Sequence, residues 1–109
     1  MTLQQLKYVI TVAETGTITE AAKKLYISQP SLTNAIHDLE KEMNVEIFHR
    51  TNKGIDISKE GEDFLGYARQ VVEQYQLVED RYIEKKAMDT RRDRTEVAQE
   101  ILDSYDPAQ

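Results

Sequence analysis

Residues 19–43 contain two short amphipathic segments joined by a tight connection, and this pattern constrains the fold more than any other feature of the chain. In the second segment apolar residues recur at steps of three and four, with one adjacent pair, so they share one stripe of a helix. They are Leu32, Ala35, Ile36, Leu39 and Met43. Ser28 suits the N-cap of this helix, and Pro30 suits its first turn, where a missing N–H costs nothing.

The polar side of this second helix carries side chains that can recognise bases. They are Gln29, Ser31, Thr33, Asn34, His37 and Lys41. Gln and Asn can pair bidentately with adenine, Ser and Thr can reach either base type, and the Thr methyl group can contact that of thymine. An ordinary amphipathic surface helix has the same stripe, so this helix alone leaves both interpretations open.

The preceding segment favours a helix-turn-helix. Thr17 followed by Glu20 has the pattern of a capping box, which predicts a helix over about 18–25. The small pair Ala21–Ala22 allows a second helix to cross closely, as a helix-turn-helix requires. We expect Tyr26 and Ile27 to be buried at the corner. Some folds of this kind bind only protein, and that alternative stays open.

An earlier helix would complete a three-helix unit. Thr2 with Gln5 is a second possible capping box, and Gly16 is a natural stop because it accepts positive φ. The apolar residues on one side are Leu3, Leu6, Val9, Ile10 and Ala13, with Tyr8 and Val12 near the edge. We expect these residues to serve packing alone.

A small hairpin is predicted after the second segment. Asn44 can adopt the left-handed conformation that ends a helix. Asn52-Lys53-Gly54 is a turn signal between two β-prone stretches, roughly 46–50 and 55–57. The result is a two-stranded wing with Arg50, Asn52 and Lys53 at or near its tip. A wing cation can hold a phosphate or enter a minor groove, although a solvated hairpin with incidental charges fits Lys53 alone equally well.

Residues 1 to about 65 resemble the winged helix-turn-helix domain of the LysR-type transcriptional regulators. AAKKLYISQPSLT, then IHDLE, then IFHRT fall in the order and spacing of that family, and ISKEGEDFL follows. The resemblance implies a mainly α fold: three helices, a two-stranded wing and a long linker helix. It also implies that the start of the third helix lies in the major groove of a palindrome-like operator.

Matching positions give the DNA-binding residues that the resemblance implies. Those facing bases or adjacent phosphates are Gln29, Pro30, Ser31, Thr33 and Asn34, and the wing contacts are Arg50 and Lys53. We add His37 from the polar side of the helix. Two positions depart from the family: Asn34 stands where a basic residue is common, and Asn44 stands where Gly is usual. The first leaves the target sequence open, and the second is mild because Asn tolerates positive φ.

The charge balance argues against DNA binding at first sight. The chain has 14 Lys and Arg against 20 Asp and Glu, for a net charge of −6, whereas a DNA-binding protein is expected to carry a basic patch. The excess acid is unevenly distributed. Residues 1–57 hold six cations and seven anions, and the rest of the chain holds eight and 13. A near-neutral domain should bind nonspecific DNA weakly and depend on specific contacts, which dimerisation would double.

The segment after the wing predicts one long helix with an apolar seam. Ser58 suits its N-cap, Glu60 and Glu62 suit the positive end of the helix dipole, and no proline follows until Pro107. Apolar residues then recur at alternating steps of four and three, the spacing of a heptad seam. They are Phe64, Ala68, Val71, Tyr75, Val78 and Tyr82.

This predicted helix is too long for its own domain to cover. About 28 residues span roughly 40 Å, so the seam calls for a partner, most simply the same helix of a second chain. The alternative is a helix folded back on its own domain. The family resemblance independently implies an antiparallel linker-helix dimer, which would present two reading helices to two half-sites on one face of the duplex.

We divide the chain into a DNA-binding domain over residues 1–58, a linker or dimerisation helix over residues 59–88, and a charged tail over residues 89–109. Asp93 with Glu96 predicts a short helix in the tail. Its apolar face would comprise Val97, Ile101, Leu102 and Tyr105. The mixed charges over 84–94 favour a solvated helix end or hinge over nucleic-acid contact by Arg91, Arg92 and Arg94.

Several classes of function find no support. Relatives in the resembled family continue into an effector-binding domain, which we expect to be absent, so no small-molecule site is predicted. The chain has no Cys, no signal peptide and no run of about 18 apolar residues, which predicts a cytoplasmic protein without a membrane segment. His37 and His49 lack matched carboxylates for a metal site, and no nucleophile elbow or phosphate loop occurs. We expect no cofactor and no enzyme activity.

Two functional classes remain. The first is a sequence-specific transcription regulator, or its DNA-binding fragment, that binds double-stranded DNA as a homodimer. The alternative is a winged-helix dimerisation module that pairs with longer relatives and lowers their DNA occupancy.

Overall fold

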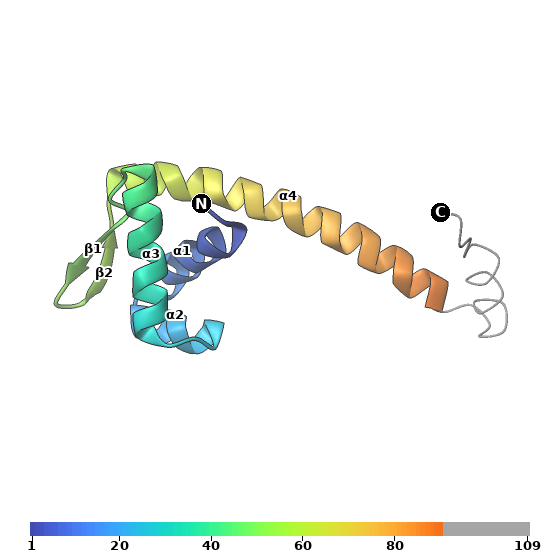
Figure 1. The fold of residues 1–109 in the computed structure, drawn as a ribbon, viewed down its shortest axis with the longest axis horizontal. Coiled ribbons are helices and arrows are strands. Elements are labelled where there is room, and N and C mark those ends of the chain that lie inside the picture. The colour runs from blue at the N-terminus through green and yellow to red at the C-terminus, as the bar shows by residue number, and fades with distance from the viewer. Residues whose placement is uncertain (91–109) are drawn as a thin grey trace. The chain divides into compact units, whose positions relative to one another are not determined.

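The computed structural model describes the backbone of residues 1–90 and the side chains of residues 1–83, and it confirms a mainly α winged helix-turn-helix (Figure 1). The elements in chain order are α1 (Leu3–Thr15), α2 (Ile18–Leu25), α3 (Gln29–Met43), β1 (Phe48–Thr51), β2 (Gly54–Ile57) and α4 (Lys59–Thr90). Residues Met1–Glu73 form one compact unit, and a second unit begins at Gln74. The predicted tail helix and the three tail arginines lie outside the described residues.

Side-chain caps define where the first two helices begin. At α1 both halves of the predicted capping box form: Thr2 Oγ1 accepts from the Gln5 amide at 3.1 Å, and Gln5 Oε1 accepts from the Thr2 amide at 2.9 Å. At α2, Thr17 Oγ1 accepts from the Glu20 amide at 3.1 Å. Each bond satisfies a backbone donor that the helix itself leaves unpaired.

The third helix has the predicted limits. Ser28 Oγ accepts from the Ser31 amide at 3.2 Å, Pro30 lies in the first turn, and Asn44 ends the helix with a φ of 53°. Asn tolerates this left-handed conformation because its short polar side chain can bond locally. The chain therefore turns sharply after α3 without glycine.

The corner between α2 and α3 differs from our expectation. Ile27 packs against the core, but Tyr26 is 93% exposed. Tyr26 is the C-cap of α2, with a left-handed φ of 57°. That conformation reverses the chain and directs the next residue inward, so one corner residue is buried and the other is not. The prediction that Tyr26 is buried was wrong.

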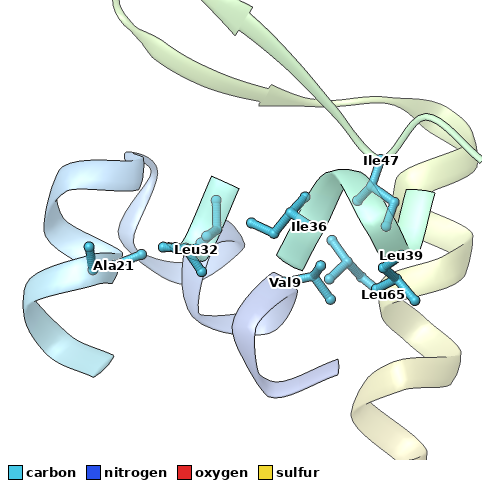
Figure 2. Packing of buried hydrophobic residues seen from close by; sticks show 9 residues of the cluster. Val9, Ala21, Leu32, Ile36, Leu39, Ile47 and Leu65 are labelled. Atoms are coloured by element: carbon cyan, nitrogen blue, oxygen red, sulfur yellow. The ribbon is translucent and has the colours of Figure 1, made fainter. Parts of the chain in front are cut away.

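The core lies where α1, α3 and the start of α4 meet (Figure 2). Its fully buried large side chains are Leu32, Leu39, Ile47, Leu65, Val9 and Val12. Burying each such side chain stabilises the fold by about 1.5–3 kcal/mol. Val12 lies inside the core and not at the edge of the α1 stripe, because α1 packs against both α2 and α3. Met43, the last member of the predicted α3 stripe, is exposed.

The wing is an antiparallel hairpin with a two-residue turn. Phe48 pairs with Ile57 and Thr51 with Gly54, leaving Asn52 and Lys53 at the turn. The first strand begins two residues later than predicted. The Ile47 amide donates to Glu40 Oε2 at 2.7 Å, so the segment before Phe48 bonds to α3 and does not extend the strand. The wing is attached to the turn between α1 and α2, where the Ile55 amide donates to the Gly16 carbonyl at 3.1 Å.

Ser58 connects the wing to α4. Its Oγ accepts from the Gly61 amide at 2.8 Å, and its own amide donates to the Ile47 carbonyl at 2.9 Å. Glu60 and Glu62 lie in the first turn of α4, where the helix dipole favours negative charge. The predicted N-cap thus fixes the start of α4 to the segment that leads into β1.

Candidate nucleic-acid interface

The two sides of α3 have opposite surroundings, which is what a base-reading helix requires. Leu32, Ile36 and Leu39 are buried in the core. The predicted DNA-binding residues lie on the other side, where Thr33 is half-buried and the rest are exposed: Gln29, Pro30, Ser31, Asn34 and His37. The fold therefore leaves amides and hydroxyls of α3 accessible to a ligand.

The first turn of α3 contains a linked pair of hydroxyls. Ser28 Oγ lies 2.8 Å from Ser31 Oγ and also accepts from the Ser31 amide. The bond that the Ser28 hydroxyl donates to Ser31 Oγ therefore holds the Ser31 side chain against the start of the helix. A side chain held in this way loses less freedom when it binds a base or a phosphate.

The wing brings a cation beside α3. Arg50 Nη2 lies 3.4 Å from Thr33 Oγ1, and both side chains line a cleft of about 330 Å³. The cleft is bounded by α2, α3 and the wing, with no carboxylate in its lining: Thr17, Ile18, Thr19, Gln29, Thr33, Arg50, Thr51, Gly54 and Ile55. Three of the predicted DNA-binding residues thus share one concave, polar surface.

The other predicted residues lie around this cleft or apart from it. Lys53 is exposed in the wing turn and does not line the cleft. His37 lines a larger cleft of about 490 Å³ near the C-terminal half of α3, together with Glu40, Lys41 and Glu46. A mixed-charge lining suits DNA less well than the cleft beside Arg50 does. His37 also lines a small cavity of about 30 Å³ together with Thr33 and Arg50, so it lies next to the surface that these two residues form.

The cleft residues that lie outside the predicted site include two threonines, Thr19 on α2 and Thr51 on β1. Thr19 follows the N-cap of α2, and Thr51 ends β1. Spacing along the sequence does not connect them, because only the docking of the wing on the Gly16 carbonyl brings β1 to α2. The two threonines Thr17 and Thr19 at the start of α2 were a signal available in the sequence.

Ion pairs distinguish the cations near α3 from those on α2. Lys23 lies 3.7 Å from Glu20, and Lys24 lies 4.0 Å from Glu14, both as exposed pairs that contribute little stability. Within residues 1–83, neither Arg50 nor Lys53 forms an ion pair. Arg50 and Lys53 on the wing, like Lys41 on α3, therefore carry charge that no bonded carboxylate among these residues balances.

The apolar seam of α4 is partly used by its own domain. Ala68 is 2% exposed and Phe64 packs against the core, so these two predicted dimerisation residues are already covered. The four that follow are exposed: Val71, Tyr75, Val78 and Tyr82. Three further apolar residues of α4 are exposed outside the predicted heptad positions: Tyr67, Leu77 and Ile83, of which Ile83 is expected to flank the seam.

Tyr75 has a neighbour that disfavours its ionised form. A hydrogen bond to Glu79, followed by repulsion from the charge of that carboxylate, raises the pKa of Tyr75 above its usual value of 10.0. The phenol therefore stays neutral across the physiological range. A neutral Tyr75 is compatible with a place in an apolar seam.

The described part of the chain offers neither a metal site nor a membrane-spanning helix. No cluster of three His, Cys, Asp or Glu side chains is arranged to hold a metal ion there. No helix among the same residues combines the length and apolarity that crossing a bilayer requires.

Comparison with known proteins gives a consistent family. A family model described as "Bacterial regulatory helix-turn-helix protein, lysR family" matches residues 3–62. The HTH-type transcriptional regulator ClcR of Pseudomonas putida is 43% identical over 72 residues, which are 66% of this chain and 24% of ClcR. YofA of Bacillus subtilis, also an HTH-type transcriptional regulator, is 43% identical over 67 residues, 62% of this chain and 24% of YofA. The chain spans about a quarter of the length of these curated relatives.

Solved structures agree with these sequence matches. The CbnR_DBD–DNA complex matches with a TM-score of 0.72 and 37% identity, covering 79% of this chain and 99% of that one. CbnR, a LysR family transcriptional regulator, matches with a TM-score of 0.71 and 39% identity, covering 75% of this chain and 28% of that one. These relatives are transcription regulators and not enzymes, in agreement with the sequence analysis.

Proposed function

Because the chain belongs to the lysR family of bacterial regulatory helix-turn-helix proteins, we propose that it binds double-stranded DNA sequence-specifically as a homodimer. In this proposal α3 enters the major groove of each half of a palindrome-like operator. Gln29, Ser31, Thr33 and Asn34 contact bases or adjacent phosphates, and the wing contacts the backbone. The proposal rests chiefly on one observation: the polar side of α3 is uncovered while its apolar side is buried.

The chemistry of the α3 surface supports base recognition. Amide side chains such as Gln29 and Asn34 can pair bidentately with adenine, and the hydroxyls of Ser31 and Thr33 can donate to or accept from base edges. Asn34 supplies no positive charge where relatives often have a basic residue. Specificity in this protein would therefore come from neutral hydrogen bonds more than from a charged contact to guanine.

The electrostatics support a binding mode that depends on few phosphate contacts. Arg50 and Lys53 provide unpaired positive charge at the wing, while residues 1–57 have six cations against seven anions overall. Each phosphate neutralised releases counterions and steepens the salt dependence of binding. We expect a small slope of the logarithm of the binding constant against the logarithm of the salt concentration for one protomer. Two protomers on one duplex would double this slope.

The exposed part of the α4 seam supports dimerisation. Apolar side chains exposed in a row on one helix are costly in water. A second copy of α4 would cover Val71, Tyr75, Val78 and Tyr82 and link two reading helices for half-sites about one helical turn apart. In the CbnR_DBD–DNA complex a similar domain is bound to DNA, which supports the same mode here.

Binding to a pool of genomic fragments tests the proposal. The whole chain would be titrated against the pool by fluorescence anisotropy at several salt concentrations, with a fragment of shuffled sequence as the control. We expect a subset of fragments to bind at least about 1,000-fold more tightly than the shuffled control. The bound species should contain two protomers of 12.6 kDa each.

Uniform weak binding to all fragments would contradict sequence-specific recognition. A dimer that binds no fragment, but forms mixed dimers with a longer LysR-type relative, would support the dimerisation-module alternative instead. A monomer bound to a single half-site would retain DNA recognition and remove the homodimer from the proposal.

A further inference from the structure

Arg50 and Thr33 are joined by a hydrogen bond whose direction is fixed by chemistry. Arg50 Nη2 lies 3.4 Å from Thr33 Oγ1, a long distance that indicates a weak, orienting contact. A guanidinium group has five N–H donors and no acceptor, so the Thr33 oxygen accepts. One of the two lone pairs of the Thr33 hydroxyl is therefore directed toward the wing.

The hydrogen of the Thr33 hydroxyl is not used within the described part of the chain. Threonines in helices commonly donate to the carbonyl one turn earlier. Thr11 does so to Lys7 at 2.8 Å, and Thr15 does so to Thr11 at 3.0 Å. No such bond forms from Thr33 to Gln29 in this region, because the Thr33 oxygen faces Arg50 instead. Thr33 thus keeps a free donor on the side of α3 that is not buried.

We propose that Arg50 positions Thr33 so that its hydroxyl acts as a hydrogen-bond donor to a base in the major groove. The preferred base edge then carries an acceptor at that point: N7 or O6 of guanine, N7 of adenine, or O4 of thymine. The edges that present N4–H of cytosine or N6–H of adenine are disfavoured. The inference rests on the proposed function, because it assigns a chemical preference to one residue of that site.

Charge strengthens this assignment. Accepting a bond from a cationic donor draws electron density from the Thr33 oxygen, which makes its own hydrogen a better donor and its second lone pair a poorer acceptor. Arg50 forms no ion pair among residues 1–83. The Glu40 carboxylate lines a small cavity with Arg50 and Thr33, but it accepts from the Ile47 and Phe48 amides. Lys53 is the matched control, because it is a cation of the same wing without a hydrogen bond to Thr33.

The DNA arm of the test measures discrimination and not affinity. The half-site base pair read by Thr33 is located as the one whose preference changes in Thr33→Val. At that pair, replacing the acceptor edge should weaken wild-type binding by about 3- to 10-fold, the range of one hydrogen bond. This weakening by the base replacement should vanish in Thr33→Val and in Arg50→Met, and persist in part in Arg50→Lys. Lys53→Met should weaken binding to every target while leaving unchanged the ratio of affinities for the two bases.

A second arm needs no DNA. The NMR signals of the Thr33 methyl and Cβ should shift in Arg50→Met and stay in place in Lys53→Met. If both variants leave them unchanged, the contact does not orient Thr33 and the inference is overturned, whatever the DNA arm gives. An equal loss on all targets in Arg50→Met would also overturn it, because Arg50 would then act on the backbone alone.

The two proposals fail in different ways. If the wild-type protein shows no sequence preference at all, the proposed function fails, and an intact Arg50–Thr33 signal then marks a purely structural contact. If the wild-type protein is specific, and Arg50→Met keeps the same ratio of affinities for the two bases at the pair read by Thr33, only the present inference fails.

Discussion

Gly61, in the first turn of α4, packs directly on the backbone of Ile47. A Cβ at Gly61 would lie 2.9 Å from the Ile47 Cα and still closer to its carbonyl oxygen. That oxygen already accepts from the Ser58 amide, so it cannot withdraw without losing the bond that ties the N-cap residue of α4 to Ile47. Only glycine allows α4 to start this close to the segment that leads into the wing.

We therefore expect Gly61→Ala to lower the free energy of unfolding by about 2 kcal/mol, because overpacking exceeds the gain in helix propensity. Urea denaturation measures it as a lower midpoint with an unchanged slope. Gly66→Ala is the matched control: its added Cβ meets nothing within 4 Å, so it should stabilise by about 0.5–1 kcal/mol. A midpoint for Gly61→Ala equal to that of Gly66→Ala would show that no clash exists.

Replacing Tyr26, the C-cap of α2, should stabilise the protein. This residue combines a left-handed φ of 57° with almost complete exposure, so its ring contributes little packing and its backbone is strained. Tyr26→Asn should raise the free energy of unfolding by about 0.5–1 kcal/mol, since Asn tolerates this conformation better. Tyr67→Asn, which removes an exposed ring from the regular helix α4, should instead lower the free energy of unfolding by roughly a few tenths of a kcal/mol.

The helices could be predicted from the sequence because each carries its own boundary signals. Thr2, Thr17 and Ser28 occupy N-caps, and Gly16 and Asn44 end helices with positive φ, as their residue types indicate. These are local interactions, so the sequence contains them. The start of β1 was displaced because a distant carboxylate, that of Glu40, binds the Ile47 amide. The exposure of Tyr26 likewise depends on how the whole corner folds.

The candidate site could be predicted only in part, for a related reason. The polar side of α3 follows from periodicity, so Gln29, Ser31, Thr33 and Asn34 were identified. The cleft itself depends on contacts between elements: the wing docks on the Gly16 carbonyl, which brings Arg50 to Thr33. The burial of Ala68 is also a tertiary effect, because heptad spacing cannot tell a helix covered by its own domain from one covered by a partner.

Substitutions on α3 and on the wing should have different effects on DNA binding. Ser31→Ala removes a neutral hydroxyl from the proposed base-reading side of α3, so it should change the ranking of targets while leaving the salt dependence intact. Lys53→Ala removes a charge, so it should weaken all targets similarly and lower the salt slope by about 1 per protomer. Anisotropy titrations at four salt concentrations separate the two. Equal changes in ranking and slope for both variants would contradict the assigned roles.

If the exposed seam of α4 forms the dimer interface, charges placed on it should halve the mass of the protein in solution. Val71 and Val78 are 50% and 58% exposed, and both lie on the heptad seam. If a second copy covers them, Val71→Asp with Val78→Asp places charges in an apolar interface and should raise the dimer dissociation constant at least about 100-fold. Sedimentation equilibrium should then give 12.6 kDa where the wild-type chain gives twice that mass. Gln70→Asp is the control, because it adds a charge to an exposed position of α4 off the seam and should leave the dimer intact. A double variant that still sedimented as a dimer would place the interface elsewhere, and the two reading helices would then need another means of spacing.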